Sequence, residues 1–295
     1  MAAEIDEELK RHVNELIALC RLEPSEKFLF VEGPSDRRLL RWFFHATNRS
    51  AIHVSEINVV RFERDDLEQL NLDRRSNKEK VIGLMTILAK SDKAKRNSVY
   101  GLVDLDTEGF LGLKSKEPAL LRTDFTSIEL YFFDAVPIEK FFELVLHGFP
   151  IEPTELLNQM APVLEMAFYA RLANEQFGLR CDWLDISRCC KIEGNRVRFD
   201  AASWVKRYLQ KCSQYDCLNR FKTKMKEFER RRNADPRLQM HGHDFMNLLG
   251  WMITKLKNRF GLFRDPECLA RALIACVELE FIEAYPLFAE LRRIF

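Results

Sequence analysis

Short apolar runs alternate with helical patterns along the first half of the chain. Runs of strand length occur at residues 27–32, 55–62 and 98–106, and a fourth is expected within 118–125. Between them, two segments repeat apolar residues at the spacing of an amphipathic helix, namely residues 34–46, where Ser35 is a candidate helix cap, and 77–90. Strands that alternate with helices are typical of a mostly parallel sheet with crossover helices. We therefore expect an α/β fold here.

The pattern changes after about residue 135. The second half is mainly helical, with one short hairpin expected within residues 190–200 and helices expected at 137–147, 152–177, 202–230, 243–259 and 266–294. Apolar residues at helical spacing also mark residues 5–20 as a helix. We expect three regions, an N-terminal helix (1–24), an α/β domain (25–135) and a mainly helical domain (136–295).

Two of the predicted strands end in acidic residues. The first stops at Glu32, and the third runs into Asp104 and Asp106. Residues two apart in an extended chain point to the same face, so Asp104 and Asp106 are expected to project together. Sites in open α/β sheets form beyond the carboxyl ends of the strands. If the two strands are neighbours, the three carboxylates converge there.

Three convergent carboxylates repel one another unless they are protonated or neutralised by a cation. Hard oxygen ligands of this kind suit Mg²⁺ or Mn²⁺, which act on phosphate esters in many enzymes. The alternative is that these acids are solvated turn residues. If only Glu32, or only the pair Asp104 and Asp106, followed a strand, this alternative would be favoured. Their occurrence in order, each after a strongly apolar strand, favours the metal site.

The two acidic motifs resemble those of the TOPRIM domain, which occurs in topoisomerases, bacterial primases, recombination mediators and OLD-type nucleases. The motifs are Glu32-Gly33-Pro34-Ser35-Asp36 and Asp104-Leu105-Asp106-Thr107-Glu108-Gly109, and the resemblance covers about residues 25–135. It implies a TOPRIM-like fold. It also implies that Glu32 is a metal ligand or general acid/base and that Asp104 and Asp106 are metal ligands of a phosphodiester-hydrolysing nuclease.

Within the TOPRIM group, the sequence most resembles a stand-alone family that includes the AriB-type effectors of PARIS anti-phage systems. The residues that carry this closer resemblance are Lys78, Glu129 and the stretch Gly242-His243-Asp244. That likeness implies a toxic effector that cuts RNA such as tRNA. It further implies an ABC-type ATPase partner that holds the effector inactive, and a homodimer when active. The alternatives are a DNA nuclease of repair or defence, or a non-catalytic scaffold that binds nucleic acid or an ATPase.

Several residues have a structural explanation beside the functional one. Glu129 is either a ligand of a second metal or an acid in the first turn of a helix. Lys78 either stabilises charge on a phosphate or lies on a solvated helix face. Asp244 is a helix cap or, with His241 and His243, part of a metal or general-base centre.

The overall charge of the chain does not point to a particular partner. The chain has 46 basic and 45 acidic residues, so net charge by itself indicates neither nucleic acid nor membrane as a partner. A basic stretch at residues 220–232 is either a solvated helix face or a phosphate contact, and its Phe221 and Phe228 look like a buried stripe. With no membrane segment and no signal peptide in the pattern, a cytoplasmic location is expected, and the eight cysteines are expected to be buried thiols.

Overall fold

The computed structural model describes residues 10–23, 25–73, 75–91, 99–112, 119–179 and 182–295. The chain divides into two compact units. Unit 1 comprises Met1–Leu105, Lys114–Asp124 and Leu279–Phe295, and unit 2 comprises Asp106–Leu113 and Phe125–Glu278. Unit 1 thus contains α1 and the C-terminal residues 279–295 together with the sheet.

A four-stranded parallel sheet forms the centre of unit 1. Its strand order is β3-β2-β5-β6, and each neighbouring pair is parallel. The strands are β2 (Phe28–Val31), β3 (His53–Glu56), β5 (Val99–Val103) and β6 (Leu120–Arg122). A separate parallel pair joins β1 (Arg11–His12) to β4 (Val60–Arg61). The predicted parallel α/β arrangement is therefore confirmed.

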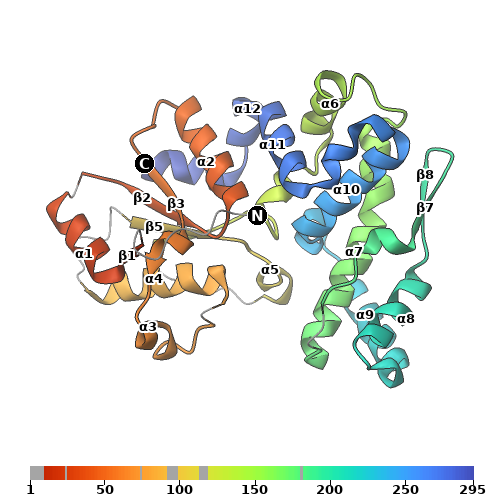
Figure 1. Cartoon of the computed structure of the whole chain (residues 1–295), viewed down its shortest axis with the longest axis horizontal. Helices are drawn as coiled ribbons and strands as arrows, with labels where there is room; N and C mark the ends of the chain where they lie inside the picture. Colours follow the sequence, from red (N-terminus) through yellow and green to blue (C-terminus); the bar gives the residue numbers. More distant parts are fainter. Residues whose placement is uncertain (1–9, 24, 74, 92–98, 113–118, 180–181) are drawn as a thin grey trace. The chain divides into compact units, whose positions relative to one another are not determined.

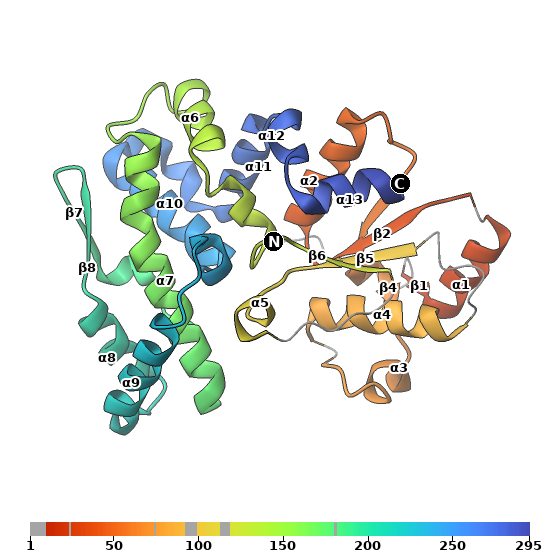
Figure 2. The same ribbon diagram turned by 180° about the vertical axis from the view of Figure 1, so that it is seen from behind.

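Helices cover both faces of this sheet (Figure 1). One face is covered by α1 and α4, and the other by α2 and α13, as the reverse view also shows (Figure 2). The helices of unit 1 are α1 (Val13–Leu22), α2 (Pro34–Ala46), α3 (Arg64–Glu68), α4 (Asn77–Ser91), α12 (Leu279–Glu283) and α13 (Pro286–Ile294). The predicted helices 34–46 and 77–90 are confirmed as α2 and α4.

The double cover explains why β2 is apolar at every position. Phe28 and Phe30 belong to the core that β2 and β5 share with α1 and α4. On the opposite face the ring of Phe288 in α13 lies 5.0 Å from that of Phe43 in α2. A parallel strand that is buried on both faces has no solvent side, so its residues do not alternate between apolar and polar.

Close packing of α4 on β5 requires a glycine in the strand. A Cβ atom on Gly101 would lie 2.7 Å from Cγ1 of Val81 and 2.9 Å from Cγ of Met85, both on α4. Any larger residue would force the helix away from the sheet. Gly101 therefore sets the distance at which the first turn of α4 can reach the carboxyl edge of the sheet.

Three details of unit 1 differ from the predictions. The predicted strand 55–62 is interrupted by the 3₁₀ helix η2 (Ile57–Val59). The N-terminal helix begins at Val13, and the earlier part of the predicted helix 5–20 falls mostly outside the described residues. The residue that caps the start of α2 is Gly33 and not Ser35. The backbone N–H of Gly33 donates a hydrogen bond to the Asp36 carboxylate at 2.9 Å.

Unit 2 is mainly helical, with one antiparallel hairpin, as predicted. Its elements are α5 (Glu108–Leu111), η4 (Ile128–Phe132), α6 (Ala135–Leu144), α7 (Pro153–Phe177), η5 (Ile186–Cys189), β7 (Cys190–Glu193), β8 (Arg196–Phe199), α8 (Ala201–Lys211), η6 (Tyr215–Cys217), α9 (Leu218–Glu229), η7 (Pro236–Gln239), α10 (Gly242–Leu256), η8 (Asn258–Arg264) and α11 (Pro266–Cys276). Two predictions of single long helices are wrong: the segment 202–230 forms α8, η6 and α9, and the segment 266–294 forms α11, α12 and α13. Within the described parts of the chain, no helix meets the length and hydrophobicity of a bilayer span.

The cysteines are not all free thiols, and the prediction is wrong for Cys212, which is disulfide-bonded. Sequence spacing does not reveal such a pair because the distance between the two residues is set by the fold. Among the cysteines whose side chains the structure describes, five are free, namely Cys189, Cys190, Cys217, Cys268 and Cys276. Burial raises the pKa of Cys190 to about 12, which keeps this thiol protonated. Cys181 and the side chain of Cys20 lie outside the described residues.

Candidate active site

The acidic residues that follow β2 and β5 meet at the carboxyl edge of the sheet in unit 1. The two strands are parallel neighbours, with Phe30 opposite Gly101. Oε1 of Glu32 accepts a hydrogen bond from the backbone N–H of Asp104 at 2.8 Å. Both acidic residues are half-buried. The prediction that the first and third strands are neighbours is confirmed, and Glu32 and Asp104 lie side by side as a result.

The first turn of α4 adds polar side chains to this edge. Nζ of Lys78 donates a hydrogen bond to the carbonyl oxygen of Asp104 at 2.8 Å. Nδ2 of Asn77 donates to the carbonyl oxygen of Glu32 at 2.9 Å. Lys78 is half-buried, and its ammonium group is held beside Asp104. Asn77 could not be predicted as a site residue, because an asparagine at a helix start is too common to indicate a function.

Asp106 does not continue the extended strand. β5 ends at Val103, and the backbone N–H of Leu105 donates to Oγ1 of Thr123 at 3.0 Å, which fixes the buried Leu105 in unit 1. Asp106 has a φ of 48°, in the left-handed region, and its N–H donates to the carbonyl oxygen of Thr126 within unit 2. Aspartate is among the few residues that tolerate this conformation. The prediction that Asp104 and Asp106 project from one face of an extended chain is therefore wrong.

Glu129 lies in unit 2, in the first turn of η4, and faces the N-terminus of α10. A Cβ atom on Gly242, the first residue of α10, would overlap Oε2 of Glu129 and Oγ of Ser127. Gly242 therefore lets the two oxygens approach the helix end. The partial positive charge at a helix N-terminus stabilises a carboxylate. The backbone of Glu129 is in the first turn of η4, and its carboxylate lies at the first residue of α10.

Two buried polar atoms lie near this helix end. Oγ of Ser127 and Nδ1 of His241 are both buried, and neither has a hydrogen-bond partner among the described residues. Burial lowers the pKa of His241 to about 3, and the positive charge of Arg171 acts in the same direction. His241 is therefore neutral at physiological pH. Ser127 could not be predicted as a site residue, since nothing in the neighbouring sequence distinguishes it from other turn serines.

The Gly242-His243-Asp244 stretch has a mainly structural role. Asp244 is buried in the first turn of α10, where its two oxygens accept from Nε and Nη2 of Arg171 at 2.9 Å each. Nε1 of Trp183 donates to the same carboxylate at 3.1 Å. The residue before α10 is His241, so the interpretation of Asp244 as a helix cap is wrong, although its role is structural. His243 is exposed, and its ring lies 5.4 Å from that of His241.

The donor chemistry of the sheet edge fits a hard divalent cation. Glu32 and Asp104 supply carboxylate oxygens, which Mg²⁺ and Mn²⁺ prefer. Among the residues that the structure describes, no three side chains of His, Cys, Asp or Glu gather as a complete metal site. The structure brings Glu32, Lys78 and Asp104 together in unit 1, whereas Asp106 and Glu129 belong to unit 2.

Comparison with known proteins adds no relative. No protein-family model matches the sequence, and no curated protein matches it. The candidate site therefore depends on its own geometry and on the resemblance of its two acidic motifs.

Proposed function

We propose that this protein is a metal-dependent nuclease that hydrolyses phosphodiester bonds with Mg²⁺ or Mn²⁺. The observation that carries the proposal is the hydrogen bond from the Asp104 N–H to the Glu32 carboxylate, 2.8 Å long, between the ends of two adjacent parallel strands. Two motifs that lie 72 residues apart in the sequence share one edge of the sheet through this bond. Ligands bind at such edges in open α/β folds.

Each residue of this edge has a role in the proposed chemistry. Glu32 and Asp104 would hold the cation, and the resemblance to TOPRIM nucleases adds Asp106 and Glu129 as further ligand candidates. A bound divalent cation polarises a phosphoryl oxygen and lowers the pKa of water. Lys78 contributes a positive charge beside Asp104, where it would stabilise a phosphate group.

The biological role follows from the resemblance alone. We infer a toxic effector of a bacterial anti-phage system that acts in the cytoplasm, cuts RNA such as tRNA and is a homodimer when active. An ABC-type ATPase would keep it inactive until infection. The chain would then be toxic when it is expressed without that partner.

The test is cleavage of total tRNA and of plasmid DNA by the purified chain, with Mg²⁺ or Mn²⁺ and with EDTA. Glu32→Gln keeps an oxygen that accepts the Asp104 N–H but removes the charge that a cation needs. We expect at least a loss of about 100-fold, in line with the cost of removing one group that stabilises charge in a transition state. The matched control is Glu139→Gln, which neutralises an exposed acid on α6 and should leave the rate unchanged.

Full activity in EDTA, or in Glu32→Gln, would contradict the proposal. Cleavage of DNA but not of RNA would support nuclease activity but overturn RNA as the proposed substrate. Toxicity that survives Glu32→Gln would overturn the link between the sheet edge and the cellular effect.

A further inference from the structure

The helix α9 and the residues that follow it concentrate positive charge. Residues 218–232 contain seven basic side chains and two acidic ones, Glu227 and Glu229. Their net charge is 7 − 2 = +5, whereas the whole chain has a net charge of +1, so all other residues together carry 1 − 5 = −4. A cluster of this size in a nearly neutral protein indicates an anionic partner.

The basic side chains are on the solvent side of α9. The opposite side buries Phe221, Met225 and Phe228, which confirms the apolar stripe predicted from the sequence. Lys224 forms an ion pair with Glu227, and Arg232 forms one with Glu165. Arg231 donates a hydrogen bond to the carbonyl oxygen of Phe110 at 3.2 Å. Among the described residues no carboxylate forms an ion pair with the remaining four basic residues, Arg220, Lys222, Lys226 and Arg230. Most of the charge is therefore available to a ligand.

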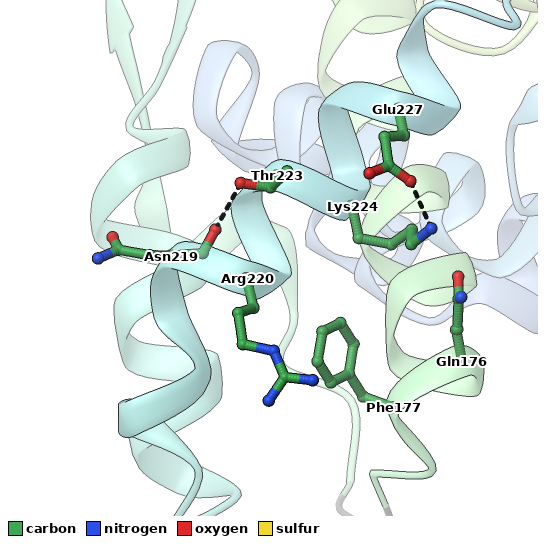
Figure 3. A pocket seen from close by; sticks show the side chains of 7 residues that line it. All are labelled: Gln176, Phe177, Asn219, Arg220, Thr223, Lys224 and Glu227. Atoms are coloured by element: carbon green, nitrogen blue, oxygen red, sulfur yellow. Dashed lines mark hydrogen bonds and ion pairs between the residues drawn. The ribbon is translucent and has the colours of Figure 1, made fainter.

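A hollow lies between the end of α7 and α9, and the ring of Phe177 forms part of its wall (Figure 3). Its volume is about 460 Å³. Cζ of Arg220 lies 5.5 Å from the centre of the Phe177 ring, so a planar cation and a half-buried ring stand next to each other in it. The exposed amide side chains of Gln176 and Asn219 also line the hollow. These groups offer stacking surfaces and hydrogen-bond donors and acceptors within one pocket.

We propose that this surface binds a single-stranded polynucleotide, with one unpaired base in the hollow. The cations of α9 would contact phosphates, which lie along any nucleic acid strand. Phe177 and Arg220 would stack with a base, and the amides of Gln176 and Asn219 would reach its edge. A duplex keeps its bases stacked inside, and an acidic polypeptide has no base, so neither uses the hollow. The inference rests on the proposed function only in that a nuclease needs a polynucleotide substrate.

Binding is measured with the full-length Glu32→Gln protein in EDTA, so that cleavage plays no part. The probe is a fluorescent single-stranded RNA of about 15 nucleotides, followed by anisotropy over a range of salt concentrations. The variant Lys222→Gln/Lys226→Gln/Arg230→Gln leaves the stacking residue Arg220 in place. It should bind weakly and reduce the salt slope by about 2, since each phosphate contact on a single strand contributes about 0.7. The control Lys191→Gln/Lys206→Gln/Lys255→Gln removes three exposed lysines elsewhere in unit 2 and should bind normally.

Two single substitutions separate stacking from charge. Phe177→Leu keeps an apolar side chain in the hollow but removes the ring. It should weaken binding about tenfold without changing the salt slope. Glu227→Gln removes an acid from the hollow and frees Lys224, so binding should become tighter. Circular dichroism and the thermal midpoint of each variant establish that it is folded.

Three results would overturn the inference. The first is a basic triple variant that binds no worse than its control. The second is equal affinity for the RNA and for a duplex of the same sequence, since a duplex offers no base to the hollow. The third is competition by poly-glutamate at equal charge concentration, which would indicate an acidic protein as the partner. If the protein binds the RNA as expected but cleaves no nucleic acid, the proposed nuclease function is wrong and the proposed binding surface on α9 is supported.

Discussion

His241 is held neutral by its place at the start of α10. Its Nδ1 is buried without a hydrogen-bond partner among the described residues, and burial lowers its pKa to about 3. An unfolded histidine titrates near pH 6.5. Between these two values the unfolded chain binds the extra proton, so the contribution of His241 to stability is complete above about pH 6.5 and is lost as the pH falls towards 3. The slope is at most about 1.4 kcal/mol per pH unit.

Replacement of this histidine by a neutral side chain should remove the slope. We expect His241→Gln to lower the free energy of unfolding at neutral pH but to make it depend less on pH between about 4.5 and 6.5. Urea unfolding at the two pH values measures the difference. His243→Gln is the control, because that histidine is exposed and should leave the pH dependence as it is. An unchanged slope in His241→Gln would show that other groups carry the pH dependence.

Among the elements, α7 and α10 are joined by a buried ion pair. The Asp244 carboxylate on α10 accepts two hydrogen bonds from Arg171 on α7, and Cζ of Arg171 lies 4.0 Å from the centre of the Trp183 ring. Asp244 is 3% exposed. Removing one charge of a buried pair leaves the other charge buried without a partner. This lowers the free energy of unfolding far more than the loss of an ion pair at the surface does.

Asp244→Asn should therefore lower the free energy of unfolding by about 3 kcal/mol. The asparagine still accepts a hydrogen bond but no longer neutralises Arg171. Urea denaturation gives the value. As a matched control, Glu267→Gln breaks the exposed pair with Arg271 on α11 and should cost about 0.5 kcal/mol or less. Equal losses in the two variants would mean that the buried pair does not hold α7 to α10.

At the scale of the whole chain, the C-terminal segment stabilises a unit that is remote in sequence. Phe288 of α13 is fully buried against Phe43, and the ring of Phe295 lies 5.1 Å from that of Tyr100 on β5. The final residues therefore complete the cover of the sheet.

Phe288→Ala should destabilise unit 1 by about 3–5 kcal/mol through the cavity it creates. Hydrogen exchange should rise first in β2 and β5, which unit 1 contains, and less in α7 and α10 of unit 2. Phe245→Ala, which removes an equally buried ring from unit 2, should give the reverse pattern. If Phe288→Ala instead exposed α7 and α10 first, the C-terminal segment would stabilise the helical unit, as the predicted boundary at residue 135 implies.

Much of the fold could be predicted because local patterns record burial. The apolar run of β2, the helical spacing of α2 and α4 and the mainly helical character of the second half follow from which side chains each element buries. The position of Glu32 and Asp104 at strand ends could be predicted in the same way. The break at η2, the left-handed backbone of Asp106 and the disulfide of Cys212 could not, because each depends on contacts with residues remote in sequence. The breaks within the predicted helices 202–230 and 266–294 were not predicted either.

The apolar pattern of the chain is enough to predict that two acidic motifs follow strands, since strand length and chain direction are local properties. Long-range packing makes β2 and β5 neighbours, so that the Glu32 carboxylate accepts a hydrogen bond from the Asp104 N–H. The same packing brings Lys78 to this edge, lets Glu129 approach the start of α10 beside Gly242, and joins residues 279–295 to the sheet. Strand order and helix packing are set by long-range contacts, which no local spacing contains.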